Sequence, residues 1–447
     1  MIRSTPATGP LRVHPSNPRY FTDGSGRAIY LTGSHTWINL KNIEATDPPF
    51  PFDYTAYLDL MQEYHHNFMR MWTWELTKYT YPSFNGAFKY VEPFSWPRTG
   101  PGEALDGKPK FDLSQFNQGY FERLRSRVIA ARDRGIYASI MLFEGHAVQL
   151  SDPPWRWDGH PFNVNNNINE IDGDPNGDDK GLEIHTLEIP AVTALQEAYI
   201  RKVIDTVNDL DNVLYEISNE TGPYSTDWQY HIINYVKSYE ASKPNQHPVG
   251  MTFQYKGGDN ATLFDSPADW ISPGHTSSER YKDDPPPADG NKVIISDTDH
   301  LWGTSGAERK WVWKSFLRGL NPIYMDPYGR PHHPPPDESI RENMGYTLSY
   351  ANKVNLAAMV PRGDLASSTY CLANPAADGA QYLVYLPDGG AVTVDLSASP
   401  GELSVTWFDP STGGTVYKGM TTDGAEQSFT APFGGDAVLH IWDGPIF

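Results

Sequence analysis

Short apolar runs rich in β-branched and aromatic residues recur along most of the chain, and segments of helical periodicity separate them. Such alternation is typical of a parallel α/β sheet or barrel. Eight runs fit the pattern: residues 28–37, 67–74, 137–146, 212–220, 248–254, 270–275, 292–300 and 322–328. Eight strand–helix units predict a (β/α)8 TIM barrel.

Helical segments between the runs support this fold. In residues 114–134, Phe121, Leu124 and Val128 share one face, and Gly135 follows where a helix can end. Residues 191–210 repeat the same apolar periodicity. The sequence therefore predicts amphipathic helices packed around the strands.

The two ends of the chain differ from the barrel. After residue 356, apolar and polar residues alternate between "DGG", "SPG" and "STGG" turns, which predicts a small antiparallel β-sandwich. The start contains a predicted hairpin around "DGSG" (23–26). We thus expect an N-terminal tail and β-hairpin over 1–27, the barrel over 28–356 and the sandwich over 357–447.

Composition limits the partners of the protein. The formal net charge is −20 and no Lys/Arg block is present, so phosphate backbones and anionic membrane surfaces would be repelled. We therefore expect neither nucleic acid nor a membrane as partner, and no oligomeric state is indicated. The single cysteine, Cys371, excludes an internal disulfide, and no apolar signal or membrane-spanning run is present. Two locations stay open: secreted or periplasmic if a signal peptide was removed, otherwise cytoplasmic.

Polar and aromatic side chains gather where the predicted strands end. In a TIM barrel these ends build the active site. In chain order they are His35, Trp37, Arg70, Trp72, Trp74, Glu144, His146, Asn219, Glu220, Gln254, His275, Asp297, Asp299, His300, Trp302, Asp326 and Tyr328. Two carboxylates that flank a glycosidic bond can hydrolyse it, and aromatic faces can stack on sugars. This combination predicts a sugar substrate.

The motif "YEISNE" (215–220), followed by an acidic seventh strand end, resembles the clan A glycoside hydrolases. These are retaining (β/α)8 enzymes whose acid/base is the Glu of an Asn-Glu pair after strand four, and whose nucleophile is a Glu after strand seven. The resemblance implies that Glu220 is the acid/base, that Asn219 binds the sugar 2-hydroxyl and that Arg70 is the clan's strand-two arginine. "FTDGSGRAIYLTGSHTW" (21–37) and the terminal "GGDAVLHIW" (434–442) resemble the apiosidase-like branch, which carries a C-terminal sandwich of collagen-binding type.

The seventh strand departs from the clan. It ends in "ISDTDH" (295–300), so the second carboxylate would be Asp297 or Asp299 instead of Glu. Asp is one methylene shorter, and the backbone must come closer to reach the ~5–5.5 Å carboxyl separation of a retaining site. Asp297 aligns with the end of the apolar run and is favoured, but both stay candidates, and inversion stays open.

These residues predict a glycosidase that cleaves a plant or microbial glycan and requires no cofactor. The alternatives are a carbohydrate-binding protein on an inactive barrel and a metal-dependent hydrolase that uses the histidines. Structural roles are also open: Glu220 as a capping or ion-pair residue, the Asp297/Asp299 pair as a turn, and Glu144 as a partner of Arg70.

A separate motif suggests calcium. "DGDPNGDDKGLE" (172–183) matches an EF-hand loop, with Asp172, Asp174, Asn176 and Glu183 as oxygen ligands and Gly177 at the turn. Asp179 and Pro175 are unusual there, and the flanks lack the two helices. The alternative is a solvated acidic loop.

Overall fold

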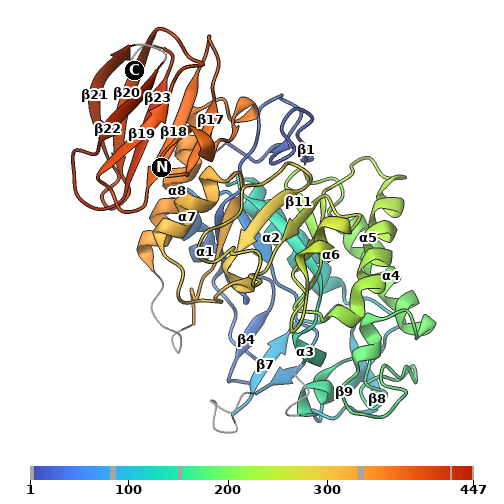
Figure 1. Ribbon diagram of the computed structural model, residues 1–447. Helices are drawn as coiled ribbons and strands as arrows, with labels where there is room; N and C mark the ends of the chain where they lie inside the picture. Colours follow the sequence, from blue (N-terminus) through green and yellow to red (C-terminus); the bar gives the residue numbers. More distant parts are fainter. Residues whose placement is uncertain (1–4, 81–86, 150–153, 331–336, 423–424, 445–447) are drawn as a thin grey trace. The chain divides into compact units, whose positions relative to one another are not determined.

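The computed structural model describes residues 5–80, 87–149, 154–330, 337–422 and 425–444. Its largest sheet has eight strands in the order β3-β15-β14-β13-β12-β11-β10-β5. They are β3 (Gly33–His35), β5 (Phe68–Met71), β10 (Tyr137–Glu144), β11 (Val213–Asn219), β12 (Val249–Thr252), β13 (Trp270–Ser272), β14 (Val293–Asp297) and β15 (Asn321–Met325). Figure 1 labels β11 of this sheet. Each predicted run contributes one strand, so the (β/α)8 TIM barrel followed by a β-sandwich is confirmed.

The strands end before the predicted runs do. At β14, the Asp297 side chain accepts a hydrogen bond from the Asp299 amide (2.9 Å) and caps the 3-10 helix η5 (Thr298–His300). At β11, the next residue, Glu220, has φ of +54°, outside the β region. The polar ends of the runs therefore lie in the loops that follow the strands.

Helices follow as the periodicity predicts. The segments 114–134 and 191–210 contain α2 (Gln118–Arg132), which the Asn117 side chain caps, and α4 (Pro190–Val207), which begins at a proline. The others are α1 (Tyr54–Glu63), α3 (His146–Gln149), α5 (Thr226–Glu240), α6 (Asn260–Asp265), α7 (Arg309–Leu317) and α8 (Glu338–Lys353), with short 3-10 helices at Pro154–Gly159, Leu182–His185, Pro223–Ser225, Leu356–Ala358 and Gly363–Leu365. Among the described residues, none of these helices is long and apolar enough to cross a membrane.

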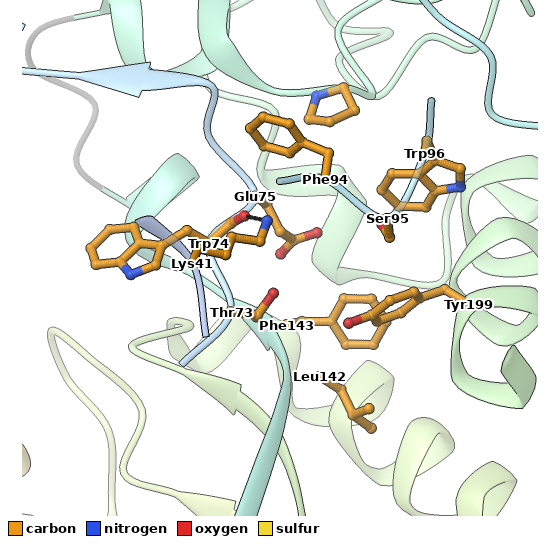
Figure 2. A pocket seen from close by; sticks show the side chains of 11 residues that line it. Lys41, Thr73, Trp74, Glu75, Phe94, Ser95, Trp96, Leu142, Phe143 and Tyr199 are labelled. Carbon is orange, nitrogen blue, oxygen red and sulfur yellow. Dashed lines mark hydrogen bonds between the residues drawn. The ribbon is translucent and has the colours of Figure 1, made fainter. Parts of the chain in front are cut away.

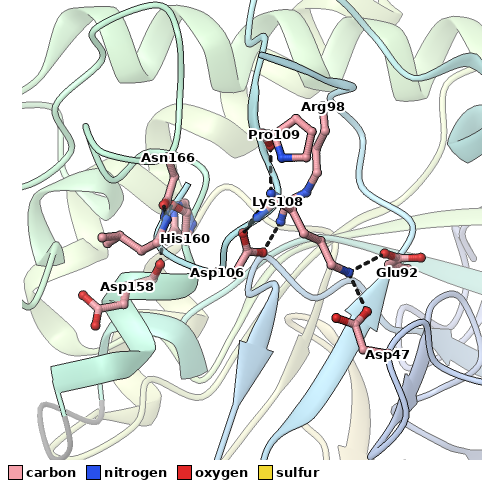
Figure 3. A network of polar contacts seen from close by, with 10 residues as sticks. Asp47, Glu92, Arg98, Asp106, Lys108, Pro109, Asp158, His160 and Asn166 are labelled. Carbon is pink, nitrogen blue, oxygen red and sulfur yellow. Dashed lines mark hydrogen bonds and ion pairs between the residues drawn. The ribbon is translucent and has the colours of Figure 1, made fainter. Parts of the chain in front are cut away.

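The chain forms two compact units. The first comprises Met1–Leu11, His35–Leu60 and Phe68–Gly274, and the second comprises Arg12–Ser34, Met61–Asn67 and His275–Phe447. In the first unit, a long insertion after β5 contains β6 (Lys78–Tyr79), β7 (Lys89–Glu92), β8 (Arg98–Glu103) and β9 (Pro109–Phe111). It forms two small antiparallel sheets, one of which also includes β4 (Asn42–Glu44) from the segment before β5. Figure 3 shows the ion pairs that fix this insertion: Lys108 to Asp47 (2.6 Å) and Glu92 (3.1 Å), and Arg98 to Asp106.

The second unit contains β14, β15, α7, α8, the N-terminal hairpin and the sandwich. In the hairpin, β1 (Arg12–Val13) pairs with β2 (Phe21–Thr22), and Phe21 bridges to Ile29 across the "DGSG" turn. The sandwich has a six-stranded sheet, β16-β17-β18-β23-β20-β21, and the pair β19-β22. Its strands are β16 (Val360–Pro361), β17 (Cys371–Asn374), β18 (Gln381–Leu386), β19 (Ala391–Asp395), β20 (Glu402–Asp409), β21 (Gly414–Thr422), β22 (Glu426–Thr430) and β23 (Ala437–Trp442).

The sandwich shares a hydrophobic core with α7 and α8. Trp313 of α7 is fully buried, and its ring lies 6.2 Å from that of Tyr385 and 5.7 Å from that of Phe408, both in the sandwich. At the edge of this core, Arg309 of α7 makes an ion pair with Asp436 (2.8 Å). The sandwich therefore completes the packing around these helices.

Deletion of residues 357–447 should accordingly give an aggregated or strongly destabilised protein, because the buried faces of α7 and α8 would become exposed to water. Size-exclusion chromatography and thermal unfolding measure this. As a control, Val416→Thr on an exposed sandwich position should leave both properties unchanged. A truncated protein that is monomeric and melts at the full-length temperature would contradict the shared core.

Candidate functional site

In the first unit, a buried arginine organises the end of β11. Arg70 of β5 is 0% exposed and donates from Nε to Glu216 Oε2 (2.8 Å) and from a terminal nitrogen to Glu216 Oε1 (2.5 Å). The same terminal nitrogen donates to Asn219 Oδ1 (2.6 Å). A bidentate arginine–carboxylate pair fixes both side chains in orientation. Arg70 therefore fixes the orientation of the Asn219 side chain through its Oδ1 oxygen.

Glu220 follows this arrangement directly and is partly exposed. A Cβ on Gly145 would lie 2.5 Å from the Glu220 carbonyl oxygen, so the close approach of the loop after β10 requires glycine there. The Gly145 amide also donates to the Asn219 carbonyl (2.7 Å). Burial raises the pKa of the Tyr255 hydroxyl, and the nearby negative charge of Glu220 raises that pKa further. Tyr255, which the sequence analysis did not single out, thus lies within electrostatic reach of Glu220.

The charged pair supports a stability prediction. Arg70→Met should reduce the free energy of unfolding by about 3–5 kcal/mol, because Glu216 would keep a buried charge without its partner. The double variant Arg70→Met/Glu216→Met should recover much of that loss, since neither charge would remain. Urea unfolding measures both variants. Equal stabilities of the single variant and wild type would contradict this role of the pair.

Aromatic side chains predicted to bind sugar pack against one another in the first unit. Trp72 donates from Nε1 to His35 Nδ1 (2.9 Å), and Trp74 donates from Nε1 to the Trp37 carbonyl (2.7 Å). The two indoles are stacked, with centroids 6.2 Å apart, and the Trp74 ring meets the edge of His146 at 5.1 Å. Trp37, Trp72 and Trp74 are only 4–6% exposed. Within this unit, Trp72, Trp74 and His146 form one cluster of contacting rings.

Glu144 belongs to a buried polar cluster centred on Glu75. The Glu75 amide donates to Glu144 Oε1 (3.3 Å), and the Glu144 amide donates to Glu75 Oε2 (3.1 Å). Glu75 oxygens lie 3.5 Å from His160 Nε2 and 3.8 Å from His185 Nε2. Burial opposes the charge of Glu75, but the two neighbouring imidazoles outweigh it and lower the Glu75 pKa to about 2. This cluster ties the segment after β5 to the end of β10.

Lys41 completes the cluster. Figure 2 shows Lys41 and Glu75 among the residues around a small cavity. The Lys41 ammonium donates to the Trp74 carbonyl and lies 4.4 Å from the centre of the Phe94 ring. Burial lowers the Lys41 pKa to about 7, although the Glu75 and Glu144 charges act to raise it. Lys41 therefore fixes the backbone at Trp74.

Two other predicted residues of the first unit have polar neighbours. His146 Nε2 lies 3.3 Å from a terminal nitrogen of the buried Arg156, and burial followed by that positive charge lowers the His146 pKa to about 3. His146 is therefore neutral at ordinary pH. Gln254 is buried and donates from Nε2 to the Thr226 hydroxyl (2.9 Å), which orients its amide.

In the second unit, Asp297 and Asp299 lie at the end of β14. Asp297 is 0% exposed, and one of its oxygens caps η5 as described above. Asp299 Oδ2 lies 3.6 Å from His300 Nε2, and both side chains are 3% exposed. The two aspartates therefore occupy different surroundings: Asp297 is held by backbone, and Asp299 lies beside an imidazole.

The remaining predicted residues of this unit lie around β15 and the loops near β14. Asp326 is fully buried and accepts two hydrogen bonds of 2.6 Å from Arg341 of α8, so it joins β15 to that helix. Its Oδ1 also accepts from the amide of the partly buried Tyr328 (2.9 Å). His275 Nδ1 accepts from the Lys282 amide (3.3 Å). Trp302 follows η5.

The acidic loop 172–183 is held by contacts among its own residues. Asp172 accepts from the Asp174 amide (3.0 Å), Asp174 accepts from the Asp179 amide (2.9 Å), and Asn176 donates to Glu183. Calcium binding by this loop stays a prediction. Over the described residues, no group of three or more His, Cys, Asp and Glu side chains is placed to hold a metal ion.

Comparisons with known proteins agree with this fold. Residues 86–268 match a family model described as "Domain of unknown function (DUF6298)", and residues 358–441 match "Putative collagen-binding domain of a collagenase". No curated protein matches the chain.

Solved structures resemble nearly the whole chain. A glycoside hydrolase family 5 structure from Bacteroides vulgatus has 14% identity and a TM-score of 0.63, and the match covers 98% of this chain and 95% of that one. A second structure from the same organism, titled a putative glycoside hydrolase, has 12% identity and a TM-score of 0.63, with 97% and 82% covered. At these identities the likeness shows a common fold.

Proposed function

We propose that this protein is a glycoside hydrolase that cleaves a glycosidic bond in a plant or microbial glycan with two carboxylates. One observation carries the proposal: Glu220 directly follows Asn219 at the end of β11, and a fully buried Arg70 that is paired to Glu216 holds the Asn219 side chain. A glutamate that only capped a strand or formed an ion pair would not need a neighbouring side chain held in a fixed orientation. A group that delivers a proton to a glycosidic oxygen does need fixed geometry around it.

Each residue has a role in this mechanism. Glu220 protonates the leaving oxygen, and its partial exposure allows contact with substrate. Asn219 forms a hydrogen bond with the sugar hydroxyl next to the reacting carbon. Asp297, or alternatively Asp299, is the nucleophile of a retaining reaction. The motif at 215–220 and the ends of the chain support placement in the apiosidase-like branch of the clan.

One observation favours a second candidate, a carbohydrate-binding protein on an inactive barrel. Asp297 replaces the clan's glutamate, and one of its oxygens is occupied by the Asp299 amide. A carboxylate engaged in this way is a weaker nucleophile than one with both oxygens directed at substrate.

A panel of aryl glycosides and of plant and bacterial polysaccharides distinguishes the two candidates. Product chromatography after incubation with wild-type protein should reveal released sugars from at least one substrate. Thermal unfolding with the same panel is measured in parallel, because a ligand that binds only the folded state raises the melting temperature. Intact substrates together with a raised melting temperature would support the binding protein and overturn the hydrolase.

A further inference from the structure

A polar hollow of about 300 Å³ lies in the second unit, beside the loop that follows η5. This volume is at the lower end of the range for ligand pockets. Its walls come from three segments: the loop with Trp302 and Gly306, residues 282–283, and α7 with its N-cap Glu308, from which Lys310, Trp311 and Lys314 line the hollow.

Hydrogen bonds join these walls, so the hollow is preformed. The backbone amide of Trp302 donates to the Thr298 carbonyl (2.7 Å), which ties the loop to η5. Trp311 Nε1 donates to the Tyr281 carbonyl (3.0 Å), and Lys314 Nζ donates to the Asp283 carbonyl (2.9 Å). Binding here would require little ordering of the protein.

Trp302 gives the hollow an aromatic wall. Its ring meets the buried Trp311 ring nearly perpendicularly, at 86° with centroids 5.5 Å apart. A Cβ on Gly306 would lie 2.7 Å from Trp302 Cδ1, so the glycine allows the loop to close against the indole. Trp302 is therefore held in place while part of its surface remains exposed.

The charge of the lining is opposite to that of the whole chain. Lys282, Lys310 and Lys314 line the hollow, against two carboxylates, in a protein of net charge −20. Asp283 lies 3.3 Å from Arg280, and Lys310 lies 3.1 Å from the highly exposed Asp388, a contact that contributes little in water. Lys282 Nζ lies 5.7 Å from the centre of the Trp302 ring. A cation and an aromatic face thus meet in one place.

We propose that this hollow is a binding subsite for a sugar unit that carries an anionic group, a carboxylate or a sulfate. The sugar ring packs on Trp302, and the anion pairs with Lys282 and its neighbouring lysines. This inference rests on the proposed glycosidase function and specifies its substrate class as an anionic glycan. The short η5 segment connects the subsite to Asp299 and Asp297, the candidate second carboxylates.

Binding is measured on the full-length Glu220→Gln variant by titration calorimetry and saturation-transfer NMR, with four probes. The probes are methyl glucuronide, glucose 6-sulfate, methyl glucoside and inorganic sulfate. At least one sugar anion should bind about tenfold or more tightly than the neutral glucoside, because a hydrogen bond to a charged group contributes more than a neutral one. Added NaCl should weaken this preference. The two sugar anions distinguish carboxylate from sulfate.

Three variants locate the site. Lys282→Met should bring the anionic and neutral sugars to within about threefold of each other, and Trp302→Ala should weaken all sugars. Lys353→Met is the matched control, since Lys353 also lies over an aromatic ring, that of Tyr350 (4.9 Å), outside the hollow. Lys353→Met should leave the affinities for all four probes unchanged.

Equal affinity for neutral and anionic sugars, or binding of inorganic sulfate as tight as that of the sugars, would overturn the subsite. These outcomes differ from failure of the proposed function, which would leave probe binding intact while the glycan panel stays uncleaved.

Discussion

Glu220→Gln is expected to lower kcat on a natural glycan by about 10²–10⁴-fold, the usual contribution of general acid–base catalysis. Glutamine has the same shape but has no proton to deliver to the leaving oxygen. With an aryl glycoside whose leaving group needs no protonation, the variant should cleave the glycosidic bond at a rate much closer to that of the wild type. Steady-state kinetics on both substrates measures this contrast.

The matched control for this variant is Glu188→Gln, an exposed glutamate shortly before α4 in the same compact unit. It should leave kcat and the melting temperature unchanged. The Glu220 variant should also melt like wild type, because this side chain is partly exposed. Near-normal turnover of the natural glycan by a folded Glu220→Gln protein would remove Glu220 from the mechanism.

Asp297→Gly is expected to abolish hydrolysis, because the favoured nucleophile toward the anomeric carbon would be removed. Removal of the side chain also leaves room for a small anion. If the reaction is retaining, added azide should restore turnover of an activated substrate and give a glycosyl azide of inverted configuration. Product NMR identifies this compound.

Asp299→Asn is the comparison for this prediction. Asp299 lies beside His300, and the amide should preserve its size while weakening kcat less severely. Azide rescue of Asp299→Gly, with Asp297→Gly merely impaired, would reverse the two assignments. An inverted product from wild-type protein would instead make the second carboxylate a base toward water.

The strands were predictable because their signal is local. Each is a short apolar run whose polar end follows directly in sequence, as in "NVLYEISNE" (212–220). The exact strand ends were less predictable. At β14, the Asp297 side chain accepts a hydrogen bond from the backbone amide two residues later, and η5 begins there. Such a side-chain bond competes with continuation of the strand, and the pattern of apolar residues does not reveal it.

The polar partners were harder to predict, because they come from distant parts of the chain. Arg70 and Glu216 are 146 positions apart, and only the presence of a charge inside an apolar strand signals Glu216. Glu75, His160 and His185 form one cluster, although two of them come from long loops without periodicity. Trp72 and Trp74 were recognisable as aromatic, but their packing against His35, Trp37 and each other depends on the folded loops.

The most direct test of the account is a proton NMR time course of wild-type protein with the glycan that responds most strongly in the panel. The hydrolase predicts new anomeric signals that grow with time, first with the configuration of the substrate. The same signals should be absent with Glu220→Gln. Substrate resonances that broaden without any new anomeric signal would contradict the account, because they would mean that the protein binds the glycan and leaves its bonds intact.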